Sequence, residues 1–425
     1  VKEGKGGLRD LQSLYWIAKY VYKTQNISDL IELNVFRSDE QEQFDKAEEF
    51  LWAVRCQMHY LSDRAIEQLS FDLQVEVAKA MGYKGSQARH GVEIFMQDYF
   101  RHATRVGDLT RIFLTSLEAV HAKDEPLLER IFKRRPKIGE EYAVIHNRLA
   151  IKSEEKFLGN PINLLKLFSE ALRTGLLIHP NAMRLVSANL SSIDKEFRQS
   201  PEAQTIFLEL LLKHGNPERA LHRMNELGFL AKFIPEFEPI VAMMQFNMYH
   251  SYTVDEHTIQ CLKTLAQIEK GELVEELPIA SSILKDGVNR KVIYVALLLH
   301  DIGKGLENDH SIEGEKIATK LSKRFTLKDS EREKISWLVR NHLLMSDFAQ
   351  KRDLSDQKTI VDFQEYVQDR ETLDLLFILT VCDIKGVSAD AWNNWKSSLL
   401  ESLYFQTLQL VSTDVKVKTL SLIHI

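Results

Sequence analysis

The sequence predicts a mainly α-helical protein, in which a helical bundle region precedes a second all-helical domain. Two long segments in the first third repeat apolar residues at intervals of three and four, the spacing that places them on one face of a helix. Further along, two apolar runs, 292–299 and 373–382, have the character of buried helices. Only 142–151 suggests a short strand.

The helical bundle is predicted for 1–135. Its first long helix carries Phe44, Ala47, Phe50, Leu51, Val54, Met58 and Leu61. The second begins near Val92 and runs through Phe113, with Gly107 as its weak point. The basic stretch 133–137 interrupts this pattern and is interpreted as a solvated linker rather than a phosphate-binding patch.

Helices are expected again in a connecting region, 136–249. Breaks are predicted at Ser191–Ser192, at Gly215–Pro217 and at Pro235. The region 250–400 then forms the third part of the chain.

Composition limits the classes of partner. The 425 residues carry a net charge of -6, which argues against nucleic acid as a bulk electrostatic partner. The longest apolar runs fall short of the roughly 18 residues that a membrane-spanning helix needs. Cys56, Cys261 and Cys382 form no paired framework and no secretory signal is present, so a cytoplasmic location is expected.

Both ends of the chain suggest a fragment. Val1 stands where a methionine is expected, and the chain enters a motif at once. The residues 420–425 are interpreted as a probable non-native tail and are left out of functional reasoning.

Ionisable residues stand at the ends of the buried helices. The run 292–299 leads into His300 and Asp301, and the turn Ile302–Gly305 is expected to end the helix and leave room for a ligand. The run 373–382 leads into Asp383 in the same way. Burying such groups costs several kcal/mol unless they are paired or bind a metal.

A third helix, starting near Val254, places His257 beside an apolar face that includes Cys261. His257, His300, Asp301 and Asp383 could therefore converge on one divalent ion. Taken singly, each residue has a simpler interpretation. Cys261, four residues after His257, could imitate a zinc-binding pair with it but is more simply a small core residue. Asp383 could be a helix-end residue paired with Lys385.

The joint pattern resembles the HD superfamily of metal-dependent phosphohydrolases. The match consists of His257, the run His300-Asp301-Ile302-Gly303-Lys304, and Asp383, in that order. The segment 250–258, HSYTVDEHT, more narrowly resembles the HD domain of the bifunctional PII uridylyltransferase/uridylyl-removing enzymes. The segment 2–12, KEGKGGLRDLQ, is similar to the junction that follows the nucleotidyltransferase core in that family.

This resemblance implies an all-α HD phosphohydrolase domain at 250–400 and makes 1–135 the remainder of the uridylyltransferase region. The implied reaction is metal-dependent hydrolysis of uridylyl-tyrosine on the signalling protein PII, releasing UMP, in the regulation of nitrogen metabolism. Mg²⁺ or Mn²⁺ would be the cofactor and would lower the pKa of a bound water toward neutrality. His300 and Asp301 would be catalytic as well as metal ligands.

Further roles are implied for the remaining polar residues. Lys304 would stabilise charge on the phosphoryl group, or would be only a surface cation. His310 and His342 would be ligands of a second ion or general acids for the leaving tyrosine oxygen, and His250 a further site residue.

The N-terminal motif implies a nucleotide site. Gly4, Gly6 and Gly7 would present backbone amides to the triphosphate of UTP, with Arg9 as counter-charge. No Asp-x-Asp pair follows in this chain, so the transferase half is expected to be inactive. The glutamine-sensing ACT domains of the family are also missing, so glutamine would act only through parts outside this sequence.

Two other functions remain open. An HD hydrolase could act on a free nucleotide or alarmone and need no protein-docking surface. A non-catalytic regulatory module could hold a metal only for structure, in which case bound metal would not be accompanied by turnover.

Overall fold

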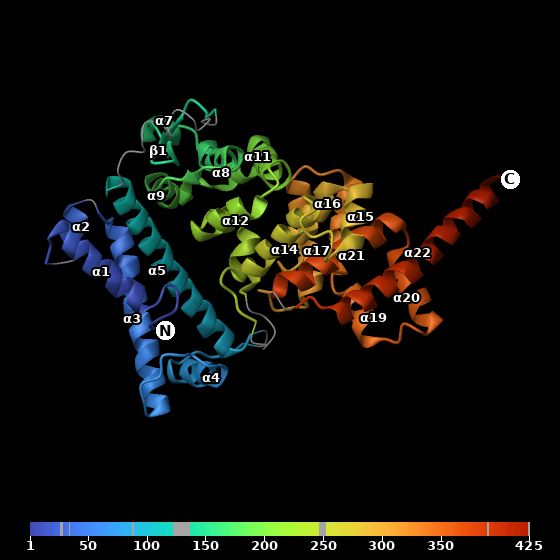
Figure 1. The fold of residues 1–425 in the computed structure, drawn as a ribbon, viewed down its shortest axis with the longest axis horizontal. Helices are drawn as coiled ribbons and strands as arrows, with labels where there is room; N and C mark the ends of the chain where they lie inside the picture. Colours follow the sequence, from blue (N-terminus) through green and yellow to red (C-terminus); the bar gives the residue numbers. More distant parts are fainter. Residues whose placement is uncertain are drawn as a thin grey trace. The chain divides into compact units, whose positions relative to one another are not determined.

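The computed structural model describes residues 1–25, 29–33, 35–86, 89–121, 137–245, 252–388 and 391–423 (Figure 1). The chain forms two compact units. Unit 1 consists of Val1–Arg198 and His222–Phe246, and unit 2 of Gln199–Leu221 and Asn247–Ile425. The boundary predicted at 135/136 and most of the basic stretch lie outside the described residues, so the division into three regions stays a prediction.

Unit 1 begins with helices that confirm the predicted periodicity. They are α1 (Leu8–Tyr22), α2 (Asp29–Glu32), α3 (Ser38–Ser62), α4 (Phe71–Ala80) and α5 (Gly91–His121). Most apolar residues on the predicted faces of α3 and α5, among them Phe44, Leu51 and Phe95, are buried, whereas Phe50 is partly buried and Leu61 is exposed. Helix α5 continues through Gly107 without a break.

The strand expected within 142–151 is a hairpin of two strands, β1 (Tyr142–Ile145) and β2 (Arg148–Ile151). The two turn residues, His146 and Asn147, have φ values of 46° and 59°. Two successive residues with positive φ are typical of the tight turn that joins antiparallel strands. A short strand β3 (Leu177–Ile178) pairs in parallel with β2.

Short helices complete unit 1 and its junctions with unit 2. They are α7 (Glu154–Leu158), α8 (Ile162–Thr174), α9 (Pro180–Ala188), η1 (Leu190–Ser192), α10 (Lys195–Gln199), α12 (Pro217–Glu226), α13 (Phe229–Phe233) and η2 (Pro235–Ile240). The prolines begin helices here, as their fixed φ favours.

The secondary-structure elements of unit 2, among its described residues, are all helices. Its elements are α11 (Pro201–Leu212), α14 (Val254–Glu269), α15 (Pro278–Asp286), α16 (Arg290–Leu299), α17 (His310–Arg324), α18 (Asp329–Arg340), α19 (Leu344–Lys351), α20 (Gln357–Val367), α21 (Arg370–Val387) and α22 (Asn394–Ile423). Helix α16 contacts α14, α18 and α21. All eight residues from Val292 to Leu299 are buried, as predicted.

The position of Asp383 corrects one expectation. Helix α21 continues to Val387, so Asp383 lies inside the helix rather than at its end. Nothing in the following Ile384 and Lys385 stops a helix, and Lys385 pairs with Glu276 instead of Asp383.

None of the described helices combines the length and the apolar character needed to cross a membrane. The backbone of α22 is described as far as Ile423, whereas residues 424–425 of the predicted tail lie outside the described part. The interpretation of 420–425 as a non-native tail stays a prediction.

Candidate metal centre

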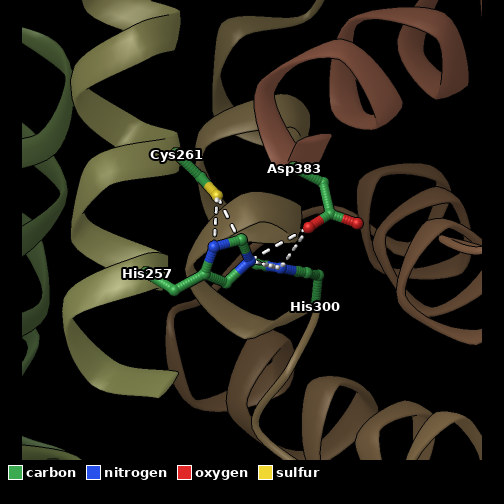
Figure 2. A group of neighbouring side chains, drawn as sticks. All are labelled: His257, Cys261, His300 and Asp383. Carbon is green, nitrogen blue, oxygen red and sulfur yellow. Dashed lines mark hydrogen bonds and ion pairs between the residues drawn. The ribbon is translucent and has the colours of Figure 1, made fainter. Parts of the chain in front are cut away.

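Three helices of unit 2 bring the predicted ligands together. His257 comes from the first turn of α14, His300 from the end of α16 and Asp383 from α21 (Figure 2). Nε2 of His257 lies 3.0 Å from Oδ1 of Asp383 and 3.3 Å from Nε2 of His300. The remaining pair, Nε2 of His300 and Oδ1 of Asp383, is separated by 3.7 Å.

The carboxylate of Asp301 extends this group in two directions. Its Oδ2 lies 3.6 Å from Nε2 of His257, 3.4 Å from Nε2 of His300 and 2.7 Å from Nζ of Lys304. Its Oδ1 lies 3.6 Å from Nε2 of His342. The Asp301 carboxylate thus faces His257 and His300 through Oδ2 and His342 through Oδ1.

Backbone carbonyls orient two of the histidines. Nδ1 of His300 lies 2.7 Å from the carbonyl oxygen of Leu297, and Nδ1 of His342 lies 2.8 Å from that of Val339. In each histidine the Nδ1–H group donates to the backbone carbonyl, and Nε2 is left facing the other side chains of the site. Metal-binding histidines commonly have this arrangement.

Asp301, His310 and His342 form a second group, whose ligand atoms all lie within 4.8 Å of one another. His310 is the first residue of α17, whose N-cap is Asp309. Nε2 of His310 and Nε2 of His342 are buried and have no hydrogen-bond partner among the described residues. Such orphaned nitrogens beside a carboxylate fit a cation that binds between them.

Burial makes these charges costly. His257, His300, Asp301 and His342 are each at most 2% exposed. Burial opposes the charged form of the imidazoles, yet the nearby carboxylates raise the pKa of His300 to about 10. Cys261 and Asp383 likewise raise the pKa of His257 to about 10 against its burial.

The other titratable groups differ from these two imidazoles. Burial opposes ionisation of Asp301 and Asp383, but the pKa of both carboxyls is held well below its usual range, by Lys304 and the two histidines for Asp301 and by His257 and His300 for Asp383. Burial lowers the pKa of His342 to about 4 and also lowers that of His310. The two carboxylates are thus balanced by Lys304 and by the two imidazoles of raised pKa, and a cation that binds there would take the place of the imidazole protons.

Gly303 has a role other than the expected one. A Cβ at this position would lie 2.1 Å from the carbonyl oxygen of His310 and 2.7 Å from the backbone nitrogen of Gly314. The absence of a side chain therefore lets the turn after α16 pack against the start of α17, rather than leaving space for a ligand.

The glycine-rich turn before α1 lies in unit 1 and uses most of its amides internally. The amide of Gly6 donates to Oδ2 of Asp10, and that of Gly7 to the carbonyl of Gly4. Gly6 has a φ of 73°, and a Cβ there would lie 1.8 Å from the carbonyl oxygen of Ala103. Arg9 pairs with Glu3. This geometry explains Gly6 and Gly7 by packing, and the predicted triphosphate role of the turn stays a prediction.

Cys261 lies closer to the site than the sequence interpretation assumed. Its Sγ is 3.6 Å from Nε2 of His257. The spacing of four residues on one helix was the available signal, but a small buried core residue was the simpler explanation of it. His250 lies outside the described residues.

Three protein families match successive parts of the chain. Residues 1–114 match "GlnD PII-uridylyltransferase", and residues 142–233 match "Uridylyltransferase GlnD third domain". Residues 254–384 match "HD domain" and include every residue of the metal centre described above.

Two curated relatives carry the same name. The bifunctional uridylyltransferase/uridylyl-removing enzyme of Ruegeria pomeroyi is 65% identical over 407 residues, which cover 96% of this chain and 45% of the relative. The enzyme of that name from Cereibacter sphaeroides is 60% identical over 416 residues, covering 98% of this chain and 45% of the relative. The chain thus spans about half the length of these relatives.

Proposed function

Because this chain carries two GlnD-type uridylyltransferase domains followed by an HD domain, we propose that it removes uridylyl groups from the protein PII. The reaction is hydrolysis of the phosphodiester between UMP and a tyrosine. The observation that carries this proposal is the convergence of His257, His300, Asp301 and Asp383 on one point of the HD domain. The relatives are uridylyl-removing enzymes by name, and the family matched by residues 1–114 names PII.

The same four residues hold a divalent cation, Mg²⁺ or Mn²⁺. Imidazole and carboxylate ligands suit these metals, with Mn²⁺ the better match to the imidazoles. Bound there, the cation supplies a nucleophile at neutral pH and a Lewis acid for the phosphoryl oxygens. The distances from Asp301 to both imidazole sets support a second cation position formed with His310 and His342.

The pKa of His342 favours the ligand role over the acid role. Because burial lowers this pKa to about 4, the imidazole of His342 is neutral near neutral pH; its one proton lies on Nδ1 against Val339, so Nε2 has none to give the leaving tyrosine oxygen. His310, whose pKa burial also lowers, is assigned to the same group. A water molecule is left as the proton donor.

Lys304 balances the negative charge of Asp301. Its Nζ lies 2.7 Å from Oδ2, and its side chain is 14% exposed. With a divalent cation held by Asp301, the ammonium group of Lys304 would stabilise negative charge on a phosphoryl oxygen of the substrate.

The N-terminal part contributes binding rather than transfer. We assign UTP and PII as partners of the complete protein, glutamine as an effector acting through ACT domains outside this sequence, and the cytoplasm as its location. The metal-binding Asp-x-Asp pair of a transferase is not in this sequence. The purified chain should therefore fail to label PII from UTP, and labelling above a no-enzyme control would contradict this assignment.

The deciding experiment incubates the chain with uridylylated PII and Mn²⁺ and measures released UMP by chromatography. The parent chain should release UMP, and the Asp383→Asn variant, with equal helix content, should not. Hydrolysis of free nucleotides or alarmones at a higher rate than of uridylylated PII would replace the proposed substrate. Bound metal without any turnover would assign the site a structural role.

A further inference from the structure

Cys261 lies one helical turn after His257 on α14 and is fully buried. Its Sγ is 3.6 Å from Nε2 and 3.8 Å from Nδ1 of His257 (Figure 2). The thiol occupies space that Gly386 of α21 leaves open, since a Cβ at Gly386 would lie 2.5 Å from Sγ. The sulfur is thus held against the metal centre by two helices.

The thiol and three of the predicted ligands form one compact group. The ligand atoms of His257, Cys261, His300 and Asp383 all lie within 4.8 Å of one another. Zinc bonds of about 2.0–2.3 Å place tetrahedral ligand atoms roughly 3.3–3.8 Å apart. The distances among the nitrogen and oxygen atoms are 3.0, 3.3 and 3.7 Å, close to that range.

The sulfur needs only a local movement to join them. It now lies beside the imidazole of His257, at nearly equal distance from both ring nitrogens. Its Sγ lies within 4.8 Å of the ligand atoms of His257, His300 and Asp383, so a change of the Cys261 side-chain rotamer is the movement that the ligation asks for.

Asp301 and Cys261 are then alternative fourth ligands. Asp301 is already paired with Lys304 through Oδ2 and faces His342 through Oδ1. A hard cation such as Mg²⁺ or Mn²⁺ prefers the carboxylate, whereas a thiophilic cation prefers the thiolate. The identity of the cation thus selects the ligand set.

We propose that Cys261 is a ligand for thiophilic cations, so that Zn²⁺ or Cd²⁺ binds to His257, Cys261, His300 and Asp383. As the Sγ–metal bond forms, the thiol proton passes to the solvent. Four protein ligands complete a tetrahedral sphere and leave no position for water or substrate. This form is inactive, a consequence that rests on the hydrolase function proposed above, whereas the ligation itself does not.

The test is a spectroscopic titration of the metal-free chain with Cd²⁺. A sulfur-to-cadmium bond produces a charge-transfer absorption in the ultraviolet, which imidazole and carboxylate ligands do not produce. The parent chain should develop this band and reach saturation at one equivalent. Cys261→Ser and Cys261→Ala should bind Cd²⁺ without the band, and either variant suffices if the other fails to fold.

Cys56→Ser is the matched control, because Cys56 is an exposed thiol. It should retain the full band. Competition with a chromophoric chelator should show that Cys261→Ser lowers the affinity for Zn²⁺ by at least roughly 10–100-fold, the loss typical when even a residue that only supports a metal ligand is removed. The affinity for Mn²⁺ should change little. A band that survives in Cys261→Ala, or no band in the parent with Cd²⁺ bound, would overturn the proposal.

Turnover gives a separate readout. With Mn²⁺ present, added Zn²⁺ should inhibit UMP release by the parent chain more strongly than by Cys261→Ser. If no preparation releases UMP, the hydrolase function fails, while the cadmium band alone still decides the role of Cys261.

Discussion

The two units bury their carboxylates in opposite ways. In unit 1, Glu40 lies 3.1 Å from Nε of Arg184, and Asp108 lies 3.0 Å from a guanidinium nitrogen of Arg111. In unit 2, Asp301 and Asp383 share a pocket of imidazoles, and Lys304 is the nearest lysine. A buried carboxylate with its own arginine is a structural feature. Two carboxylates that share one lysine depend for the rest of their balance on imidazole protons, which a bound cation can replace, and this difference distinguishes a site from a core.

The Asp301→Asn variant should have the largest effect on the site of unit 2. The amide preserves shape but removes the charge that faces both groups of imidazoles, so metal affinity and hydrolysis should both fall, the latter by roughly 10²–10³-fold or more. Helix content should stay near that of the parent. Circular dichroism, bound-metal analysis and single-turnover UMP release on one preparation measure all three quantities.

A structural metal would give a different result for the same variant. The melting temperature would fall with the loss of metal, and any residual hydrolysis would follow the folded fraction. An Asp301→Asn variant that stays folded and releases UMP at nearly the parent rate would show that the assignment of the His300-Asp301 pair is wrong.

Two glycines provide a matched pair of variants, one in each unit. Gly6→Ala places a Cβ against the carbonyl of Ala103 at a φ of 73°, and Gly303→Ala places one against the carbonyl of His310. Each should lower the free energy of unfolding of its unit by about 2–4 kcal/mol. Only Gly303→Ala should also weaken Mn²⁺ binding, because it displaces the turn that carries Asp301 and Lys304. Calorimetric titration with Mn²⁺ separates the two, and equal affinities would refute the coupling.

The free energy of unfolding of unit 1 should depend on pH through one buried carboxyl group. Burial and Glu226 raise the pKa of Asp108 to about 6, against the effect of Arg111. Because the folded chain holds this proton more tightly than the unfolded chain, the free energy of unfolding should fall as pH rises from about 4 to about 6, by at most about 3 kcal/mol. Asp108→Asn should remove this slope in urea denaturation of unit 1. An unchanged slope would assign it to another group.

Metal addition should affect only one unit. Mn²⁺ at 100 times its dissociation constant should raise the free energy of unfolding of unit 2 by about 2.7 kcal/mol. Hydrogen exchange in α14, α16 and α21 should slow accordingly, while exchange in α3 and α5 should not. Equal slowing in both units would mean that the cation binds outside the HD domain.

The sequence was sufficient to predict the helices that carry the site, because their signals are local. The apolar run 292–299 is continuous, and the run 373–382 is nearly so. His257, the His300-Asp301 pair and Asp383 could be selected because all three segments combine a buried helix with an ionisable side chain.

Other features depend on contacts that no local pattern encodes. Asp383 was placed at a helix end because the apolar run stops there, although α21 continues for another turn. The meeting of His310 with His342, and of Cys261 with the ligands, depends on how helices pack in three dimensions. The packing role of Gly303 becomes visible only when the start of α17 lies against it.

His300 and His342 share a feature that affects the order in which the site and the hydrophobic core are lost on heating. Each follows the last turn of a helix and donates from Nδ1 to a carbonyl of that turn, on Leu297 and Val339 respectively. Carbonyls in a last turn lack intrahelical partners and are the first to be released when a helix end frays. On gentle warming, the imidazoles would therefore lose their orientation while the hydrophobic core is still intact. Inactivation should then precede unfolding, and the helix ends would set the upper temperature at which the site works.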